Sequence, residues 1–529
     1  MPVSTTLTPA PDVTVRNPAS GEIIGKYPQQ SIEEVRAALR HAHAAQPGWA
    51  ATPLKERQHC IARLRNALLY QTDDTVQLIA DCVGKTRIDA LATEIMPAIA
   101  GSRWYERHAY RYLQPRHLKN GSLLFFSKRS TVYRVPWGVV GIIAPWNYPL
   151  GIPMHEIVPA LLAGNTVVFK TAPETLLVGF KIASLMRAAG VPDAVFQHVN
   201  IDGPVCGDLF LESGGVNKLF FTGSVRVGKL LAEKAARALV PVSLELGGKD
   251  AMIVCADADL ERAAAGAVWA GLSNAGQSCA GVERIYVHRD VYAPFMALLS
   301  QKVANLRVGR DADFNVDVGA LCTGRQVETV RRHLEDAFQQ GATVAAKAGP
   351  ASNANPQFIS PTVLTQVDHR MAVMREETFG PVLGVMPVNS DAEAVQLAND
   401  SIYGLAGSVW SRNSKKAEAL ARQIHAGAVM VNDHLLSHGL TETPWGGFKD
   451  SGNCRGHGQY AFEAVTAPKV IVDDWLKLVR HQPYWMPYDQ RTYDGLKGIL
   501  LGLYARRWPH RLKGLRRALT LLPRMLGKS

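Results

Sequence analysis

Cysteine is scarce in this chain, with seven residues among 529. They are widely spaced and no CxxC pair occurs, which argues against a disulfide framework or a zinc site and favours a reducing compartment. No apolar run reaches the ~18 residues of a membrane-spanning helix. Residues 1–13 lack the basic patch and apolar stretch of a signal peptide. We therefore expect a cytoplasmic protein without a spanning helix.

The net charge is also low over most of the chain. The formal net charge is +12, but residues 491–529 hold ten Lys or Arg and one acid, a net +9. The first 490 residues therefore carry a net charge of only +3, which argues against a general nucleic-acid-binding surface. HExxH is absent and the histidines are scattered, so no metal site is expected. His434 and His438 are four residues apart, but we interpret them as loop residues rather than ligands.

The length and the apolar content are those of a folded protein with several domains. At ~100–200 residues per domain, this length suggests two to four units. The chain is 47% hydrophobic and 20% charged, as is ordinary for soluble globular proteins. Short β-branched runs alternate with segments of helical periodicity, and the predicted strands are residues 139–143, 166–170, 195–199, 218–222 and 241–245. This alternation predicts an α/β fold with a doubly wound parallel sheet, which binds ligands at the carboxyl ends of its strands.

A second α/β stretch follows from residue 251 to about 427. It contains a predicted helix over residues 260–272, the polar turn SNAGQSC and the strand RIYVH. Residues 117–135 alternate polar and apolar side chains and predict a protruding hairpin. Residues 460–472 predict a strand to match it. Exposed edges of this kind often pair with another subunit.

The basic tail has a periodicity of its own. Leucines and one tyrosine recur at spacings of 3, 4 and 3 on either side of Pro509, with Arg and Lys filling much of the remainder. This pattern is typical of basic amphipathic helices on an anionic membrane surface. The alternative is a helical pair that packs on the body of the protein.

Two residues are candidates for covalent chemistry. Cys279 lies among small residues in GQSCAG, where a thiolate could attack a substrate, although a lone cysteine is usually structural. Glu245 ends a predicted strand before two glycines, where it could act as a general base, or pair with Lys249.

Two loops after predicted strands are candidates for ligand binding. Asn147 lies between two prolines in APWNYP, where its amide could stabilise an oxyanion or simply form a turn. The segment GSVRVG, residues 223–228, opens a helix after a strand and could receive a phosphate. It is not the GxGxxG fingerprint, and a plain turn would explain it equally well.

Together these motifs resemble the aldehyde dehydrogenase superfamily, in its NAD(P)-dependent, non-acylating form. PWNYP, FTGSxxxG, LELGGK, GQSC, EETFGPV and PWGGFKxSG occur in that family's order between Pro145 and Gly452. The family-like body runs from about residue 13 to 472.

The resemblance implies a domain plan. Residues 1–116 and 137–246 would form a Rossmann-like cofactor domain, and residues 247–445 an α/β catalytic domain. Residues 117–136 and 460–473 would be the strands of a small β oligomerisation element, giving a homodimer or homotetramer. Residues 491–529 would form the additional basic tail.

The resemblance also implies a mechanism. Cys279 would attack an aldehyde to form a thiohemiacetal, with Asn147 and the Cys279 backbone N–H stabilising the oxyanion. Hydride transfer to NAD or NADP would leave a thioester, which a water activated by Glu245 would hydrolyse to the carboxylic acid.

Cofactor contacts follow from the same resemblance. Lys170 would contact the adenosine ribose and Glu377 the nicotinamide ribose. The remaining contacts would come from Trp146, Gly223, Ser224, Gly228 and Phe379. Many members have a Glu three residues after the ribose lysine, where this chain has Pro173, with Glu174 one later. The choice between NAD and NADP therefore stays open.

The substrate is less determined. The basic amphipathic tail favours a lipophilic aldehyde, such as a fatty or isoprenoid (including carotenoid) aldehyde, and peripheral attachment to the inner face of a membrane. A semialdehyde or betaine-aldehyde dehydrogenase, or a CoA-acylating dehydrogenase, is the alternative within the superfamily. A non-catalytic binding protein that keeps the fold is a third.

Overall fold

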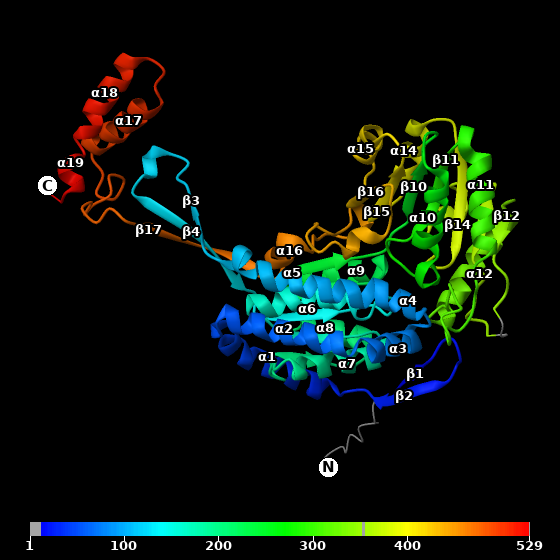
Figure 1. Ribbon diagram of the computed structural model, residues 1–529. Helices are drawn as coiled ribbons and strands as arrows, with labels where there is room; N and C mark the ends of the chain where they lie inside the picture. The colour runs from blue at the N-terminus through cyan, green and yellow to red at the C-terminus, as the bar shows by residue number, and fades with distance from the viewer. Residues whose placement is uncertain (1–11, 352–354, 528–529) are drawn as a thin grey trace, which may run out of the picture. The chain divides into compact units, whose positions relative to one another are not determined.

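The computed structural model describes residues 12–351 and 355–527. The chain divides into two compact units, one of residues 1–112 and 136–466 and the other of residues 113–135 and 467–529. Figure 1 labels most of the helices and several of the strands of both units. No helix in the described ranges is long and apolar enough to cross a bilayer.

The first sheet of the larger unit has five strands, all parallel, in the order β7-β6-β5-β8-β9. Their bounds are β5 (Val139–Ile143), β6 (Thr166–Lys170), β7 (Phe196–His198), β8 (Lys218–Thr222) and β9 (Val242–Glu245). Every residue of β6 and β8 is buried, as strands covered by helices on both faces require. The strand order reverses between β5 and β8. At such a switch point the connections leave in opposite directions and open a crevice for ligands.

The second sheet of the same unit has seven strands in the order β12-β13-β14-β11-β10-β15-β16, of which only the edge strand β12 is antiparallel. The strands are β10 (Asp250–Val254), β11 (Val282–His288), β12 (Thr343–Lys347), β13 (Thr362–Thr365), β14 (Val382–Val388), β15 (Ala406–Trp410) and β16 (Ala428–Val431). A separate antiparallel hairpin joins β1 (Asp12–Arg16) and β2 (Ile23–Pro28).

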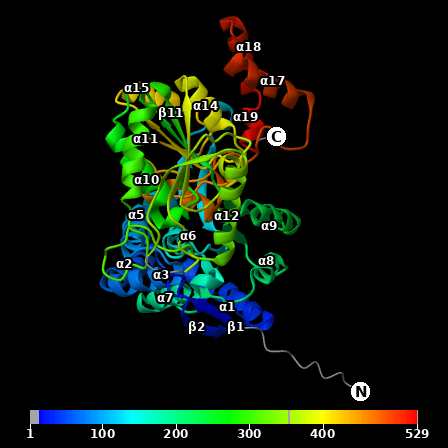
Figure 2. The same ribbon diagram turned by 90° about the vertical axis from the view of Figure 1, so that its right-hand side faces the viewer.

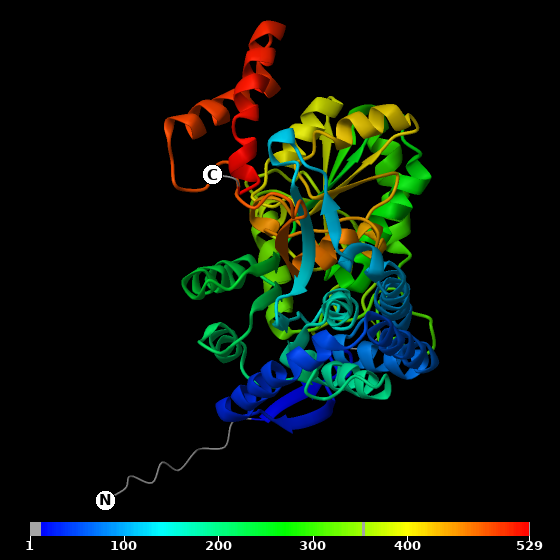
Figure 3. The ribbon, with the colours of Figure 1, turned by 90° about the vertical axis from the view of Figure 1, so that its left-hand side faces the viewer.

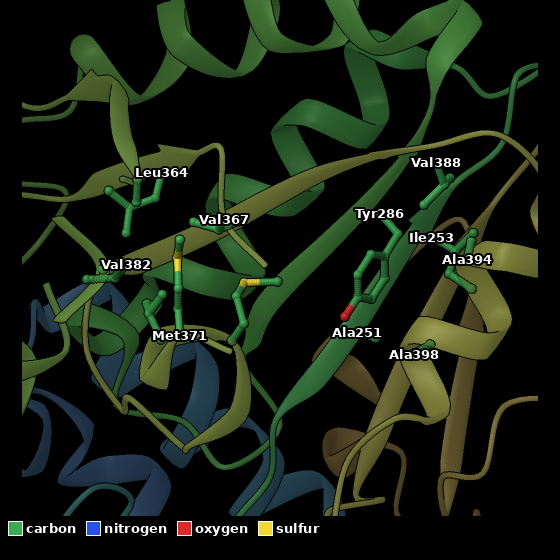
Figure 4. Packing of buried hydrophobic residues seen from close by; sticks show 14 of the residues in the cluster. Ala251, Ile253, Tyr286, Leu364, Val367, Met371, Val382, Val388, Ala394 and Ala398 are labelled. Carbon is green, nitrogen blue, oxygen red and sulfur yellow. The ribbon is translucent and has the colours of Figure 1, made fainter. Parts of the chain in front are cut away.

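Side chains on the two faces of the second sheet enter different cores. Ala251 and Ile253 of β10 belong to one apolar cluster, and Met252 and Val254 to another. Figure 4 shows the first cluster, where Tyr286 of β11 and Ala394 and Ala398 lie beside Ala251 and Ile253. Because side chains alternate along a strand, this sheet is covered by helices on both faces. Figure 2 shows α10 and α11 on one side of β11 and α12 on the other.

The helices of the larger unit fill the connections between these strands. They are α1 (Ile32–Ala51), α2 (Leu54–Tyr70), α3 (Thr72–Val83), α4 (Arg87–Ala90), α5 (Met96–Leu113), α6 (Gly151–Ala163), α7 (Leu176–Ala188), α8 (Gly203–Leu211), α9 (Val225–Ala238), α10 (Leu260–Leu272), α11 (Arg289–Ala304), α12 (Gly324–Gln339), α13 (Ala372–Arg375), α14 (Asp391–Asn399), α15 (Ser414–Ala421) and α16 (Gly458–Ala464). The predicted fold class, two α/β regions with parallel sheets, is confirmed.

The smaller unit has a three-stranded sheet in the order β17-β4-β3 and, among its described residues, three α-helices. Its elements are β3 (Arg116–Leu118), β4 (Lys128–Pro136), β17 (Thr466–Asp474), α17 (Gln490–Tyr504), α18 (Trp508–Leu519) and α19 (Leu522–Met525). Lys128 and Asp474 form an ion pair at 2.6 Å between β4 and β17. Figure 3 shows these long strands in cyan and orange.

One predicted strand is wrong in its first half. Residues 460–464 belong to α16, and the strand begins only at Thr466. Ala461 and Phe462 are buried, and the Phe462 ring packs against Tyr105 and Tyr112 with centroids 5.8 and 5.7 Å away. This packing on α5 favours one apolar helix face over the alternation that a strand needs.

Candidate active site

The loops of the switch point place three predicted residues at the edge of the first sheet. Asn147 follows β5, and Gly223 and Ser224 follow β8, the strand beside it. The Ser224 side chain caps α9, accepting from the N–H of Val227 at 3.5 Å. The N-terminus of α9, with its partial positive charge, therefore opens at the crevice.

Cys279 follows a turn with an unusual backbone. Asn274, Ala275 and Gly276 have φ of 52°, 54° and 75°, all in the left-handed region. An added Cβ on Gly276 would lie 2.2 Å from the Gly380 carbonyl oxygen, so only glycine fits at this close approach. The turn reverses the chain between α10 and β11 and leaves Cys279 partly exposed.

Asn147 and the cysteine loop are joined by hydrogen bonds. The Asn147 side-chain amide donates to the carbonyl of Gln277 at 3.0 Å, two residues before Cys279. The Asn274 amide donates to the carbonyls of both Asn147 and Gln277 at 3.1 Å. These bonds hold an amide donor beside the cysteine loop, the kind of group that can stabilise an oxyanion.

Lys85 and Glu94 hold the backbone of Asn147 in place, and the sequence alone does not predict them. Lys85 Nζ donates to Glu94 at 2.8 Å and to the carbonyl of Asn147 at 2.7 Å, and both side chains of the pair have no exposed surface. Glu94 also accepts from the N–H of Leu150 and Gly151, the first turn of α6. No spacing in the sequence marks this pair, because only tertiary contacts reveal that it is buried.

Glu245 is the last residue of β9 and lies at the same edge of the sheet. Its Oε1 accepts from the Cys454 thiol at 3.0 Å. Burial raises the pKa of Glu245 to about 7, while Cys454, Arg455 and Trp445 act in the opposite direction. A carboxyl with a pKa near neutrality is suited to general base catalysis.

Burial also raises the pKa of Cys279, and the carboxylates of Glu377, Asp250 and Glu245 add to this. The thiol is therefore protonated at neutral pH in the resting protein. A base must remove its proton as the sulfur attacks, because the thiolate is the nucleophile.

Three cavities meet at Cys279. The first, about 620 Å³, is bordered by Cys279, Glu245 and Cys454, and also by the histidines 155, 438 and 457. The second, about 550 Å³, is bordered mainly by apolar and aromatic side chains: Ala92, Pro97, Tyr148, Ile152, Trp269, Leu435, Leu436 and Trp445. No Asp, Glu, Lys or Arg of the described ranges lines this second cavity.

The third cavity, about 1300 Å³, is also bordered by Cys279. Trp146, Gly223, Ser224, Glu377 and Phe379 all border it, and the rings of Trp146 and Phe379 meet edge to face with centroids 5.6 Å apart. Glu377 accepts from the N–H of Gly248 at 2.9 Å, and burial raises its pKa to about 8. Five of the seven predicted cofactor-binding residues therefore share one cavity with Cys279 and Asn147.

Lys170 and Gly228 do not border this third cavity. The Lys170 amine donates to the carbonyl of Thr171 at 3.0 Å and is almost fully buried. An added Cβ on Gly228 would lie 2.5 Å from Leu246 Cδ2, so this glycine allows α9 to pack closely on the segment after β9. The roles predicted for these two residues stay predictions.

No cluster of three or more potential metal ligands occurs in the part of the chain that the structure describes. Both ring nitrogens of His434 have protein partners. Nδ1 lies 2.7 Å from the Ser408 hydroxyl and Nε2 lies 3.1 Å from the Ala280 carbonyl.

Comparison with known proteins identifies the family. The model of the aldehyde dehydrogenase family matches residues 7–471. A 4,4'-diapolycopene aldehyde oxidase of Methylomonas sp. is 38% identical over 488 residues, covering 92% of this chain and 90% of its own. A candidate succinate-semialdehyde dehydrogenase [NADP(+)] of Mycolicibacterium smegmatis is 40% identical and covers 83% of this chain and 84% of its own.

Solved structures agree with these matches. An aldehyde dehydrogenase from Bacillus cereus, in complex with NAD+, superposes with a TM-score of 0.83 and 32% identity over 87% of this chain and 93% of its own. The predicted resemblance is thus confirmed, and the chain belongs to the aldehyde dehydrogenase family.

Proposed function

We propose that this protein oxidises a lipophilic aldehyde to its carboxylic acid, with NAD or NADP as the oxidant. The observation that carries the proposal is the position of Cys279, which borders an apolar cavity, a large cavity at the switch point and the pocket that contains Glu245. One sulfur can therefore meet an aldehyde, a cofactor and a general base.

In the proposed reaction, a water removes the Cys279 proton as the sulfur attacks the aldehyde carbon, and Glu245 acts in the later hydrolytic step. Asn147 and the backbone N–H of Cys279 stabilise the oxyanion of the thiohemiacetal. Loss of hydride from the same carbon leaves a thioester on Cys279. Water activated by Glu245 then adds to the thioester carbonyl, and collapse of the adduct releases the acid and the thiol.

The residues that border the third cavity suit a dinucleotide in their chemistry. The capped N-terminus of α9 offers N–H groups to a pyrophosphate, and Trp146 and Phe379 offer aromatic surface to a ring. Glu377, with its pKa raised, could bond the hydroxyls of a ribose. When bound, NAD or NADP supplies the hydride acceptor. One relative is named for NADP and one structural neighbour is bound to NAD+, so the proposal includes both cofactors. The burial of Lys170 near Glu174 does not favour one cofactor over the other.

The apolar second cavity supports a lipophilic substrate. Leu435, Leu436 and Trp269 provide surface for a hydrocarbon chain, and burial of such surface contributes ~25 cal/mol per Å². The Methylomonas relative, named for a carotenoid aldehyde, agrees with this choice.

A semialdehyde substrate is the second candidate, because several relatives carry a succinate-semialdehyde dehydrogenase name. Such a substrate needs a cation for its second carboxylate. Arg455 borders the first cavity, but its guanidinium donates to the carbonyls of Gly447 and Cys454 and stacks on Phe448. The Arg455 guanidinium is already bonded and does not border the apolar second cavity, so a semialdehyde substrate is the weaker candidate.

The C-terminal helices support attachment to an anionic membrane surface. Helices α17 and α18 form a hairpin in which Gly498, Gly502 and Gly514 meet, since a Cβ on Gly514 would lie 2.4 Å from the Gly502 nitrogen. Many of the larger apolar side chains of the hairpin are exposed: Tyr493, Leu500, Tyr504, Trp508, Leu512, Leu515 and Leu519. Arg506, Arg507, Lys513 and Arg516 are exposed among them. Apolar and basic groups together bind anionic bilayers.

Strand β17 supports the proposed homo-oligomer. Val470, Ile471 and Val472 are 55%, 47% and 56% exposed at the edge of the three-stranded sheet. An exposed apolar edge strand is ready to pair with a second copy.

The test measures NAD(P)H formation by the purified protein with aldehydes of increasing chain length, with each cofactor, and with or without anionic vesicles. The proposal expects kcat/KM to rise with chain length and to rise further with vesicles. A preference for short or carboxylated aldehydes would support the semialdehyde alternative. A requirement for coenzyme A would indicate the acylating reaction.

A further inference from the structure

Cys454 is a second cysteine beside the reaction centre, and the proposed mechanism does not use it. Its Sγ lies 3.0 Å from Glu245 Oε1 and 3.4 Å from the carbonyl oxygen of Leu244. It borders the same cavity as Glu245 and Cys279. The thiol therefore contacts the proposed base directly.

The loop that carries Cys454 is fastened to the strand that carries Glu245. Leu246 donates its N–H to the carbonyl of Ser451 at 2.9 Å, and Leu244 donates its N–H to Asn453 Oδ1 at 3.0 Å. The Ser451 hydroxyl donates to the carbonyl of Gly247 at 2.6 Å. These bonds on both sides of Glu245 fix the distance between β9 and the thiol.

Gly446 keeps space for this contact. Its φ is +148°, and an added Cβ would lie 2.2 Å from the carbonyl oxygen of Cys454 and 3.0 Å from Glu245 Oε1. Any larger residue would press on both partners of the hydrogen bond. The thiol and the carboxyl thus occupy a close-fitting corner of the cavity.

The direction of the hydrogen bond follows from protonation. Burial and the neighbouring carboxyl of Glu245 raise the pKa of Cys454, so its sulfur carries a proton at neutral pH and donates it. The other carboxyl oxygen, Glu245 Oε2, is enclosed and has no partner among the described residues. One oxygen is held by the thiol and the other is left for a water.

We propose that Cys454 is a positioning residue that orients Glu245 for the hydrolytic step. The inference rests on the proposed function. In that step Glu245 Oε2 takes a proton from water as the water oxygen bonds to the thioester carbon. The carbon–sulfur bond then breaks, Cys279 leaves with a proton, and the carboxylic acid departs. No oxidant is needed, and the thiol of Cys454 is unchanged.

The hydrogen bond has a consequence for pH. It favours the ionised form of Glu245, so its loss should raise the pKa of that group and reduce the active fraction at neutral pH. The other titratable or charged groups around Glu245 and Cys454 keep their influence: Glu156, Lys218, Cys279 and Arg455, with His155, His438 and His457 lining the cavity.

The experiment compares Cys454→Ala with Cys454→Ser by rapid mixing with a long-chain aldehyde and cofactor. For Cys454→Ala we expect an NAD(P)H burst close to wild type, because the burst precedes hydrolysis. We expect steady-state turnover at pH 7 to fall ~10-fold, the size of a hydrogen bond to a charged group, and the midpoint of its pH profile to rise. Cys454→Ser, which keeps a donor, should recover most of the turnover and the wild-type midpoint.

A second measurement does not depend on turnover. Infrared difference titration of the resting protein, with Glu245→Gln to assign the band, follows the carboxyl of Glu245 directly. We expect a higher midpoint in Cys454→Ala and a restored one in Cys454→Ser. An unchanged midpoint in Cys454→Ala would overturn the inference, and so would equal losses of burst and steady-state rate in both variants. Wild-type protein without any aldehyde-dependent burst would contradict the proposed function, and the titration would still decide the role of Cys454.

Discussion

The sheet core around β10 and the C-terminal hairpin of α17 and α18 use apolar residues in opposite ways. In the core, Ile253, Val254 and their neighbours are buried between helices. In the hairpin, glycines form the contact between the helices, while Leu512, Leu515 and Leu519 are 44%, 49% and 59% exposed. Burial of leucine is a main source of fold stability. The hairpin leaves its leucine surface available to a partner, whereas the core buries its apolar surface and holds the loops of the candidate site in place.

The largest expected effect tests the core side of this comparison. Cys279→Ala should reduce aldehyde-dependent NAD(P)H formation by ~10³-fold or more, as the loss of a nucleophile does. Initial rates measure this, and a thermal melt should match wild type. Cys60→Ser, which changes a cysteine of α2 outside the three cavities, is the control and should keep the rate. Comparable losses in both variants would mean that thiol loss acts through folding.

The next effect concerns the buried ion pair of Lys85 and Glu94, which contacts the backbone of Asn147. Lys85→Met leaves Glu94 without its cation in a fully buried position, which should lower the free energy of unfolding by ~3–5 kcal/mol. Urea denaturation measures this. Lys181→Met, which removes a lysine that bonds Gln71 nearer the surface, is the matched control and should change little. A Lys85→Met protein as stable as wild type would show that the pair is not a structural support.

Glu245 should give a smaller effect that depends on pH. Glu245→Gln should slow steady-state turnover by ~10²-fold while an NAD(P)H burst remains, because a general base contributes ~10²–10⁴-fold. In wild type the raised pKa of about 7 means that the base is ionised above this pH and protonated below it. Turnover should therefore fall as the pH decreases through about 7, and the profile of Glu245→Gln should be flat there. A wild-type profile that is level through this range would contradict the assignment.

The smallest effect tests the hairpin side. Replacing Leu515 and Leu519 by Glu should weaken binding to anionic vesicles by ~10-fold or more, because each exposed leucine can bury apolar surface in the bilayer. Sedimentation with vesicles measures binding. The free energy of unfolding should change by less than ~0.5 kcal/mol, as for other surface positions. Tyr70→Glu, at an 85% exposed position of α2, is the control and should bind as wild type does. Equal binding by all three proteins would exclude the hairpin as the docking surface.

Much of this architecture could be predicted from local sequence. β5, β6 and β8 match their predicted bounds because buried parallel strands are short β-branched runs with clear limits. The helix predicted over residues 260–272 also matches. Residues 460–464 were predicted as strand and are helical, because the contacts of Phe462 with Tyr105 and Tyr112 lie far away in sequence.

The positions of the candidate site residues were predictable where a motif marked them. Asn147, Glu245 and Cys279 each lie in a recognisable motif, and the structure places all three beside cavities that Cys279 joins. The sequence did not predict the contacts of Lys85, Glu94 and Cys454. These contacts depend on burial and on partners between 9 and 209 positions away in the sequence. Positions of that kind become visible only when the fold brings the partners together.

The measurement that tests the account most directly is to trap the intermediate. Glu245→Gln protein is incubated with NAD or NADP and a long-chain aldehyde, denatured and digested, and its peptides are weighed by mass spectrometry. The account predicts the mass of the acyl group on the peptide that contains Cys279, and its absence when cofactor is omitted. An acyl group on another cysteine, or none on Cys279 while NAD(P)H is formed, would contradict it.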